Sequence, residues 1–509
     1  MKASLSVAAA STAVLASTAA AQRVLSVPVA RSSAARNSIS RRASNTYTES
    51  LTNNLTAGAY YATVSLGTPA QSATLVLDTG SSDVWVLASS SDICSSEMLQ
   101  QEYGSCISTF DPSSSSTYKL VQEDGFEIQY ADNSGAEGNY ISDTFRIGGA
   151  TVTALQMGLA FNSTVNTGIC GIGFDNDEAA ESVYPNLIDT LKSQGLIAVR
   201  AYSLYLDDLD DSTGSLLFGG IDTEKFIGTL QEVDIQPETA QGSDQSVYAA
   251  FQVSLSSLKV SGLSDDSNVL DGDVFVVLDS GTTLTYLPPN SVSTIYNAVG
   301  AYDDSQQSGF VYINCDYTSK HSDVTFDYQF GDSGPTIKVP VSEVIIDNVQ
   351  AYLSQGLVLP SDLPWNSDNV CSFGIQGDDQ LYLLGDTFLR SAYVVYDLDN
   401  KKIGLAQTNL NSSDSNVVEI SASGIPLQTG VASQITQAAS TTAPTSTATS
   451  GTTSGSNPST ISASASPSGS ASGGGGASAA TVVAPSWEVM SVTLVAAFFG
   501  FVGTAVFTL

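Results

Sequence analysis

The chain has 509 residues and is strongly acidic, with 17 Lys and Arg against 51 Asp and Glu and a formal net charge of −34. A nucleic-acid backbone would be repelled by this charge, which excludes nucleic-acid binding and favours basic partners or an acidic working pH. Solubility at a cell surface is the alternative reason for the acidity. No acidic residue precedes Arg42, so the chain after Arg42 has 11 basic and 51 acidic residues, a net charge of −40.

The first 42 residues have the pattern of two segments that are removed on maturation. An alanine-rich apolar run after Lys2 ends in three alanines, which predicts a secretory signal peptide over residues 1–21. Residues 22–42 contain five arginines and no acidic residue, and they end in the dibasic pair Arg41–Arg42. We expect a basic propeptide there that lies across an acidic cleft until it is cleaved after Arg42.

Two segments that lie 201 positions apart have nearly the same sequence, LVLDTGSS at 75–82 and VVLDSGTT at 276–283. In each segment a hydrophobic strand leads into an Asp, a small hydroxyl residue and a Gly. A carboxylate at the end of a buried strand is costly unless hydroxyls and free backbone amides hold it. One copy could be an ordinary strand end with a turn. Two copies indicate a duplicated half that brings Asp78 and Asp279 together.

The two motifs and the segments around them resemble the pepsin-like aspartic proteases over roughly residues 60–407. The other matching segments, in chain order, are SDVWV at 82–86, FEIQY at 126–130, GICGIG at 168–173, LFGGID at 217–222, LLGD at 383–386, AYVVYD at 392–397 and IGLA at 403–406. The resemblance implies an all-β, bilobal fold with the active-site cleft between two β-lobes. Short β-branched and aromatic runs separated by Gly, Asp, Asn and Ser also favour an all-β chain.

The resemblance implies that Asp78 and Asp279 are the catalytic residues. Two carboxyl groups at close range cannot both ionise cheaply, so they share a proton, and the sequence leaves open which acid holds it. A water molecule between them could lose a proton to the ionised acid while the protonated acid donates to the peptide carbonyl. The expected support residues are Thr79 and Ser280, which tie the two loops together, Ser81 and Thr282, which bond the outer carboxylate oxygens, and the glycines Gly80 and Gly281.

Tyr130 ends the segment that resembles the strand of the flap hairpin. The resemblance implies that Tyr130 caps the substrate and is steadied by Trp85, with core packing as the alternative for both. Asp132 follows two residues later, where fungal relatives that accept lysine on the acyl side of the cut carry an Asp. Asp132 could pair with a basic P1 side chain, or it could be a solvated turn residue.

Five cysteines in a secreted chain leave one over after pairing. Cys94 and Cys106 lie close together in a polar loop, and a bridge between them would close a small loop at the edge of the cleft. The resemblance implies a second bridge between Cys315 and Cys371. Cys170 has apolar neighbours and is expected to be a buried small side chain. No CxxC pair and no His cluster indicates a metal, and no cofactor is implied.

Hydrophobic periodicity stops near residue 411, and Ser, Thr, Ala and Gly dominate the chain after it. This composition predicts an O-glycosylated stalk over residues 411–478. The uncharged tail 489–509, a short spacer and the small residues Gly476, Ala477 and Ser478 together form the pattern of a GPI-anchor signal over 479–509, which would be removed. A retained membrane helix is the alternative.

The part between the propeptide and the stalk is expected to divide into an N-terminal β-lobe with the flap, 43–240, and a C-terminal β-lobe, 241–410. Short helices are expected at 186–196 and 293–300. N-x-S/T sequons predict glycosylation in surface loops at Asn54, Asn162 and Asn411.

A pepsin-like domain, a Ser/Thr-rich stalk and an anchor signal resemble the organisation of the fungal yapsin-type surface proteases. We therefore expect a monomeric aspartic endopeptidase on the extracellular face of the plasma membrane or in the cell wall. Its partners would be peptide or protein substrates with basic cleavage sites, and a membrane through the GPI anchor. The alternatives are an acid protease of broad specificity and a catalytically silent pepsin-fold protein of the wall or of cell adhesion.

Overall fold

The structure is a computed structural model, and it describes residues 25–31, 59–207, 209, 213–239, 246–263 and 268–432. The predicted signal peptide, Asn54, the anchor signal and the stalk beyond residue 432 lie outside the described residues. Within these ranges no helix combines the length and the apolar character that crossing a bilayer requires.

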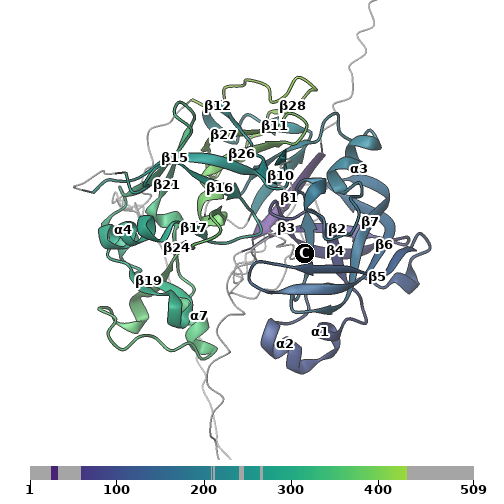
Figure 1. Ribbon diagram of the computed structural model, residues 1–509, viewed down its shortest axis with the longest axis horizontal. Coiled ribbons are helices and arrows are strands. Elements are labelled where there is room, and N and C mark those ends of the chain that lie inside the picture. Colours follow the sequence, from purple (N-terminus) through teal and green to yellow (C-terminus); the bar gives the residue numbers. More distant parts are fainter. Residues whose placement is uncertain are drawn as a thin grey trace, which may run out of the picture. The chain divides into compact units, whose positions relative to one another are not determined.

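The largest sheet among the described residues has 13 strands in the order β12-β27-β26-β9-β10-β1-β2-β3-β8-β4-β7-β6-β5 (Figure 1). Its strands in chain order are β1 Leu25–Arg31, β2 Tyr60–Leu66, β3 Gln71–Asp78, β4 Val84–Leu87, β5 Lys119–Gln129, β6 Gly135–Ile147, β7 Ala150–Ser163, β8 Gly168–Gly171, β9 Ala201–Tyr205, β10 Thr213–Phe218, β12 Phe226–Asp234, β26 Ala392–Asp397 and β27 Lys402–Thr408. Two short pairs accompany it, β11 Gly220–Asp222 with β28 Val417–Glu419, and β13 Glu238–Thr239 with β14 Ser246–Val247.

The second half of the chain builds a seven-stranded and a four-stranded sheet. The first contains β15 Gln252–Ser261, β16 Val274–Leu278, β17 Thr285–Leu287, β20 Thr325–Phe330, β21 Thr336–Pro340, β24 Ile375–Gly377 and β25 Leu383–Leu384, and the second contains β18 Tyr302–Asp304, β19 Phe310–Asn314, β22 Ile345–Ile346 and β23 Val370–Phe373. Buried and partly exposed residues alternate along β20, as they do in a strand with one face on the core. The predicted all-β, bilobal fold is confirmed.

The helices are short and lie between the strands. They are α1 Asp92–Ser95, α2 Glu97–Tyr103, α3 Leu187–Ser193, α4 Pro289–Val299, α5 Ser305–Ser308, α6 Tyr317–Lys320, α7 Val349–Ser354 and α8 Asp386–Leu389. The two predicted helices are present as α3 and α4. Helix α3 begins where the side chain of Asn186 accepts hydrogen bonds from the amides of Ile188 and Asp189, which is an ordinary N-cap.

Each half of the molecule has the same arrangement of strands around its motif Asp. Strand β3 runs parallel to β8, which pairs antiparallel with β4. Strand β16 likewise runs parallel to β25, which pairs antiparallel with β17. A Cβ on Gly171, at the end of β8, would lie 2.7 Å from the carbonyl oxygen of Asp83, and a Cβ on Gly385, after β25, would lie 2.3 Å from that of Thr282. Only glycine allows these two close crossings. Because the two halves share both the strand arrangement and the glycine, the fold contains the duplicated half that the two motifs indicate.

Strands from both ends of the chain meet in the 13-stranded sheet. Strand β26 pairs with β9, and β27 pairs with β12. The structure therefore differs from the predicted linear division at residue 240, because β12 precedes this boundary and its partner β27 follows it.

Strand β1 belongs to the segment that is predicted to be a propeptide. It pairs with β10 from Leu25 opposite Phe218 to Ala30 opposite Thr213, and it also pairs with β2. Part of the predicted propeptide thus completes the sheet in this form of the chain.

The folded region continues past the predicted start of the stalk at residue 411. The side chain of Asp222 accepts hydrogen bonds from the Ser415 hydroxyl at 2.6 Å and the Asn416 amide at 2.7 Å, and β28 pairs with β11. Ile420 and Ile425 are buried in an apolar cluster with Phe226. The folded region thus extends about twenty residues past residue 411, because a few apolar residues within a Ser- and Asn-rich segment are enough to hold it against the domain.

Candidate active site

Asp78 and Asp279 both lie where a buried strand ends. Asp78 is the last residue of β3, Asp279 directly follows β16, and their side chains are 1% and 0% exposed. A Cβ placed on Gly281 would lie 2.4 Å from Asp78 Oδ1 and 3.2 Å from Asp279 Oδ1. The structure therefore brings the two carboxyl groups to one point, which only a glycine at position 281 leaves open.

The two loops are joined by a reciprocal set of hydrogen bonds. The amide of Thr79 donates to the Ser280 hydroxyl at 3.2 Å, and the amide of Ser280 donates to the Thr79 hydroxyl at 2.9 Å. The hydroxyl of Thr79 also donates to the Leu278 carbonyl at 2.9 Å, and that of Ser280 to the Leu77 carbonyl at 3.0 Å. Because each hydroxyl both accepts and donates across the junction, the relative position of the two acids is fixed by buried hydrogen bonds.

Each carboxyl group also has an amide donor and a hydroxyl donor from its own loop. The amide of Gly80 donates to Asp78 Oδ1 at 2.7 Å, and the hydroxyl of Ser81 donates to Oδ2. The second loop repeats this pattern on Asp279, with the Gly281 amide at 2.8 Å and the Thr282 hydroxyl at 2.6 Å. In both loops the hydroxyl therefore bonds Oδ2, while the amide bonds Oδ1, the oxygen that lies nearest to Gly281 in each acid.

The environment of the pair favours a retained proton. Burial raises the pKa of Asp78 well above its usual value, and the negative charge of Asp279 raises it further, while the hydrogen bonds from Ser81 and Gly80 lower it. The raising effects prevail. The pair can therefore hold a proton at a pH where an exposed aspartate is ionised, which is the state that general acid–base catalysis by two carboxyl groups requires.

Tyr130 lies at the tip of the hairpin formed by β5 and β6. Its hydroxyl accepts a hydrogen bond from Trp85 Nε1 at 2.8 Å, and both side chains are almost completely buried. The next residue, Ala131, packs against the apolar cluster of Val277 and Leu383 in the second half of the chain. The negative charge of Asp78 contributes to a raised pKa of Tyr130, after the larger effect of burial, as expected for a hairpin tip above the acids.

Asp132 forms part of the turn at this tip. Its Oδ1 accepts a hydrogen bond from the Ser134 amide at 2.8 Å, so it fulfils the role of a turn residue. The side chain is only partly exposed, and burial raises its pKa. The preceding residue, Ala131, packs in the same apolar cluster as Tyr286 of β17, so the turn that contains Asp132 reaches the second half of the molecule. The turn role and a role toward substrate are therefore compatible.

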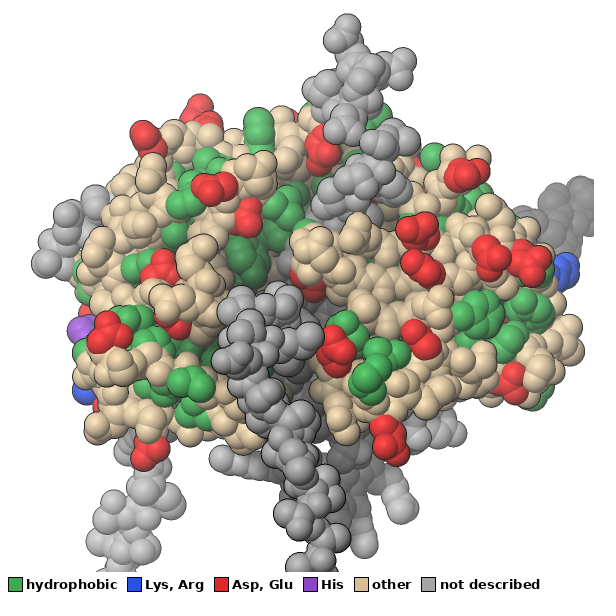
Figure 2. Space-filling view, turned by 60° about the horizontal axis from the view of Figure 1, so that its bottom comes forward, with side chains coloured by type: hydrophobic (Ala, Val, Ile, Leu, Met, Phe, Trp, Pro, Cys, Tyr) green, Lys and Arg blue, Asp and Glu red, His purple; other side chains and the backbone are tan. Residues whose placement is uncertain are grey.

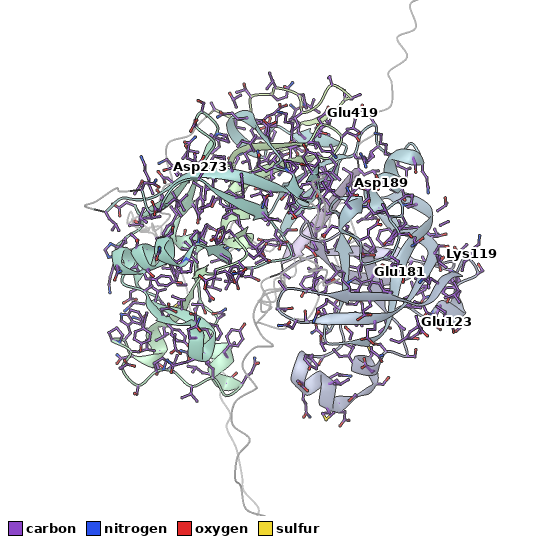
Figure 3. The ribbon with its side chains drawn as sticks, in the orientation of Figure 1. Lys119, Glu123, Glu181, Asp189, Asp273 and Glu419 are labelled. Atoms are coloured by element: carbon purple, nitrogen blue, oxygen red, sulfur yellow. A yellow bond between two sulfur atoms is a disulfide. The ribbon has the colours of Figure 1, made fainter. Side chains whose placement is uncertain are left out.

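The acidic residues are spread over the surface. Figure 2 shows one face on which acidic side chains are scattered and basic side chains are few. Glu123, Glu181 and Asp273, which Figure 3 labels, are exposed on separate parts of the described chain. A distributed charge of this kind raises the encounter rate with basic molecules, but it does not select a bond within them.

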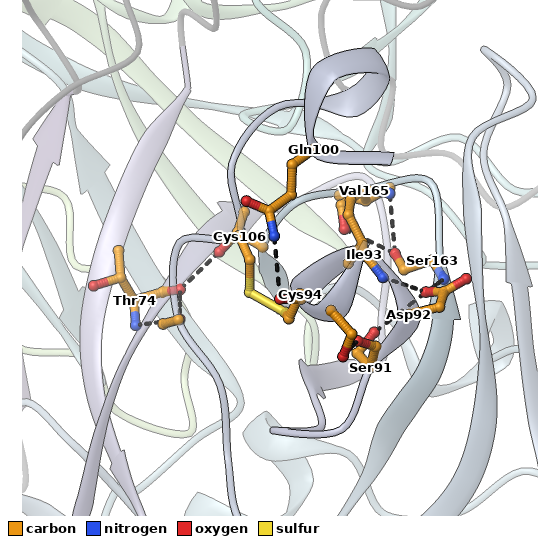
Figure 4. The surroundings of a disulfide bond; sticks show 12 residues. Thr74, Ser91, Asp92, Ile93, Cys94, Gln100, Cys106, Ser163 and Val165 are labelled. Atoms are coloured by element: carbon orange, nitrogen blue, oxygen red, sulfur yellow. Dashed lines mark hydrogen bonds between the residues drawn. A yellow bond between two sulfur atoms is a disulfide. The ribbon is translucent and has the colours of Figure 1, made fainter. Parts of the chain in front are cut away.

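Both predicted disulfides are confirmed. Cys94 is bonded to Cys106 and Cys315 to Cys371, with Cα–Cα distances of 5.1 and 5.2 Å. In the first loop Gln100 Nε2 donates to the Cys94 carbonyl at 3.1 Å (Figure 4). Cys170 is free and buried, as predicted.

Among the described residues, one group of potential metal ligands is close enough to share an ion, and it consists of Cys315, Asp347 and Cys371. Its two cysteines form a disulfide and supply no thiolate, so this group does not fit a metal.

Two of the three predicted glycosylation sites are in the described part of the chain. Asn162 is exposed, but it lies in β7 and pairs with Glu137, so the expected surface loop is a strand instead. Asn411 is exposed in an irregular segment after β27. Glycan attachment at Asn54, Asn162 and Asn411 stays a prediction.

One buried acid next to the first motif was missed by the sequence analysis. Asp83 is 0% exposed, and its carboxylate accepts hydrogen bonds from the hydroxyls of Tyr140 and Tyr184 and from the amide of Ala179. Asp83 lies within the matching segment at 82–86, but a charged residue directly before the apolar strand β4 is the only sign of a role for its side chain. Its partners lie 57 to 101 residues away, and nothing in their sequence context marks them.

The fold and the paired carboxyl groups define a class of proteins, and comparison with known sequences identifies it. Residues 59–408 match the family described as eukaryotic aspartyl protease. The chain is 39% identical over 433 residues to the probable aspartic-type endopeptidase opsB of Aspergillus oryzae, covering 82% of this chain and 83% of that protein. It is 36% identical to the candidapepsin of Candida tropicalis, over 70% of this chain and 80% of that protein. It is 37% identical to the secreted aspartic protease 4 of Candida albicans, over 71% and 79%.

The chain therefore belongs to the eukaryotic aspartyl protease family, as the resemblance predicted, and its classification as an aspartic endopeptidase is confirmed. Among solved structures, the aspartic proteinase from Irpex lacteus superposes with a TM-score of 0.52 at 21% identity, covering 70% of this chain and 96% of that chain. At this identity the likeness shows the shared fold.

Proposed function

We propose that the protein hydrolyses peptide bonds at acidic pH by means of Asp78 and Asp279. The observation that supports this most directly is the convergence of the two buried carboxyl groups on the space that Gly281 leaves open. Thr79 and Ser280 hold the loops in register, and Ser81 and Thr282 orient the carboxyl groups.

In this mechanism the ionised member of the pair takes a proton from water while the protonated member donates its proton to the carbonyl oxygen of the scissile bond. The attacking oxygen forms a tetrahedral intermediate, and its collapse passes a proton to the leaving amine. No covalent acyl-enzyme is formed. Tyr130 closes over the substrate from the flap, and Trp85 holds its hydroxyl.

The purified, processed protein should cleave a peptide mixture at acidic pH and lose this activity above neutrality, because both carboxyl groups then ionise. A statine-type peptide, whose hydroxyl imitates the tetrahedral intermediate, should block the cleavage, and a metal chelator should not. Cleavage that is indifferent to the statine peptide but sensitive to the chelator would contradict the proposal. A mock purification controls for contaminating proteases.

We also propose that the enzyme prefers Lys or Arg before the cut and that Asp132 is a principal cause. Asp132 lies at the flap tip directly after Ala131, which contacts the second half of the molecule. A carboxylate there can form a charge-assisted hydrogen bond with a basic P1 side chain, worth on the order of 1.5–3 kcal/mol, or roughly tenfold to a hundredfold in selectivity.

The Asp132→Asn variant should lose most of this preference, because the amide oxygen can still accept the Ser134 amide while the charge is gone. The measurement is the kcat/KM ratio for matched peptides with Lys or Leu at P1. The ratio should rise with pH in the wild type, because the raised pKa of Asp132 means that its charge develops only as the pH increases. Glu127→Gln removes a charge from an exposed position of β5 and should leave the ratio unchanged. If the kcat/KM ratio for Lys against Leu is undiminished in Asp132→Asn, Asp132 acts only as a turn residue.

We further propose that the enzyme is a monomer held at the outer surface of the plasma membrane or in the wall by a GPI anchor, in the manner of yapsin-type proteases. The support is the cluster Gly476–Ala477–Ser478 ahead of the uncharged tail 489–509. One of the relatives is named a secreted protease, which is compatible with an extracellular location.

A phosphatidylinositol-specific phospholipase should release the protein from cells, and deletion of residues 489–509 should send it to the medium, because the tail is the signal for anchor attachment. Partition between detergent and aqueous phases measures the release. If the treated protein stays in the detergent phase while a known GPI-anchored protein leaves it, a retained membrane helix replaces this proposal.

A further inference from the structure

The flap hairpin is linked to the first catalytic loop by a row of aromatic side chains. The ring of Trp85 in β4 lies 6.1 Å from that of Phe126 in β5, and Phe126 lies 5.4 Å from Tyr140 in β6, edge to face. Phe126 also covers Gly158, where a Cβ would come within 2.7 Å of the ring. The row therefore contains one residue from each flap strand and one residue from the strand that follows the Asp78 loop.

Hydrogen bonds fix both ends of this row. At the tip, Trp85 donates to the hydroxyl of Tyr130. At the base, the hydroxyl of Tyr140 donates to Asp83 Oδ1 at 2.9 Å. Asp83 and Trp85 are two residues apart, so both attachments come from the same short stretch that extends from the catalytic loop.

Asp83 is a fully buried carboxylate that has donors on both oxygens. The Tyr184 hydroxyl donates to Oδ1 at 2.6 Å, and the Ala179 amide donates to Oδ2 at 2.7 Å. Burial raises the pKa of Asp83, and the hydrogen bonds from Tyr184, Ala179 and Tyr140 oppose this. All three partners donate hydrogen bonds to Asp83. A carboxylate, which only accepts hydrogen bonds, can satisfy all three, whereas an amide side chain, half of which is a donor, cannot.

The two tyrosines differ in where they come from. Tyr140 belongs to the flap strand β6, where it pairs with Gln122 of β5. Tyr184 lies outside the hairpin, in the segment that precedes α3. Asp83 therefore connects the flap, through Tyr140, to a part of the domain that does not belong to the flap.

We propose that Asp83 is a positioning residue for the proposed peptide hydrolysis, which fixes Tyr130 above the acid pair by holding the flap strand through the Tyr140 hydroxyl. The inference rests on the proposed function for its kinetic consequence. In the structure, the hydrogen bond between Asp83 and Tyr140 restrains the flap, and the hydrogen bond between Asp83 and Tyr184 does not.

The test compares Tyr140→Phe with Tyr184→Phe. Each substitution keeps the ring and removes one hydroxyl from the same oxygen of Asp83, so the two variants should lose a similar amount of thermal stability. Tyr140→Phe should lower kcat/KM about tenfold, the scale of a hydrogen bond to a charged group, and should weaken the binding of a statine-type peptide. Tyr184→Phe should change both by less than about twofold.

A second measurement does not depend on activity. Hydrogen exchange at the backbone amides of residues 130–134 should become faster in Tyr140→Phe and stay unchanged in Tyr184→Phe. Equal kinetic and exchange effects in the two variants, or no effect in either, would overturn the inference. Asp83 would then stabilise the fold without positioning the flap. A wild-type enzyme without peptidase activity would refute the proposed function, and the exchange comparison would still decide the role of Asp83.

Discussion

The Asp78→Asn and Asp279→Asn variants should each lose about 10³-fold in kcat/KM, which is within the range for removal of a general acid or base. An amide can neither take a proton from water nor share one with the opposite carboxyl group. The side chain at position 78 can still accept the Gly80 amide and meet the Ser81 hydroxyl, so the loop keeps its hydrogen bonds. The melting temperature should be unchanged or higher, because the repulsion between two buried acids is gone.

The matched control for these variants is Asp222→Asn. Asp222 is also buried, and its carboxylate also accepts a hydroxyl and an amide, from Ser415 and Asn416, but it lies in β11. This variant should keep its kcat/KM even if it loses stability. Activity that survives in both dyad variants, in protein free of contaminating protease, would refute the proposed mechanism.

The sequence predicted the centre of this site because its information is local and is repeated. Each motif contains the strand, the acid, the hydroxyl residue and the glycine within eight positions, and the fold places them as two equivalent loops. The structure adds a second reason for the glycine at position 281, since a side chain there would meet Asp78.

The connections between distant strands could not be predicted in this way. The pairing of β26 with β9 joins residues about 190 positions apart, and the hydrophobic pattern of a strand does not identify the strand with which it pairs. Asp83 was missed for a related reason. Its neighbours Tyr140 and Tyr184 are ordinary aromatic residues, and only the folded chain brings their hydroxyls to one carboxylate.

The segment after residue 411 shows how composition can mislead. Ser and Asn dominate it, which favours a stalk, but Val417, Val418 and Ile420 supply a short strand and a buried side chain. A segment this short has no clear periodicity of its own. It is held by the edge that β11 offers and by the carboxylate of Asp222.

The folded protein should be most stable at acidic pH and should lose stability as the pH rises toward 9. Burial raises the pKa of Asp78 and Asp83, and it raises that of Glu178 to about 9, with a further contribution from the charge of Asp83. The folded chain therefore binds these protons more tightly than the unfolded chain. As the pH rises from a group's pKa in the unfolded chain to its pKa in the folded chain, the unfolded chain loses the proton first, and the free energy of unfolding decreases.

Asp399 has a lowered pKa, and it affects the stability of the fold only at lower pH. Burial alone would raise the pKa of Asp399, but hydrogen bonds from Lys192 and Arg200 lower it to about 2. Its stabilising effect is present above the unfolded pKa of about 4 and is lost as the pH falls toward 2. The two effects together place the greatest stability in the acidic range in which the dyad can share its proton.

Glu178→Gln should remove part of the loss of stability at high pH, because the raised pKa of Glu178 contributes to that loss. Glu178 is 4% exposed and accepts the Tyr184 amide at 2.8 Å, which the glutamine oxygen can also accept. The variant should match the wild type near pH 4 and exceed its stability at pH 9 by on the order of 5 kcal/mol, or on the order of 10 °C in Tm. Thermal melts from pH 4 to 9 measure this, with Glu181→Gln, an exposed acid three positions later, as the control that should follow the wild type. If Glu178→Gln loses Tm in parallel with the wild type, the buried proton does not reside on Glu178, and Asp78 or Asp83 has to account for the slope.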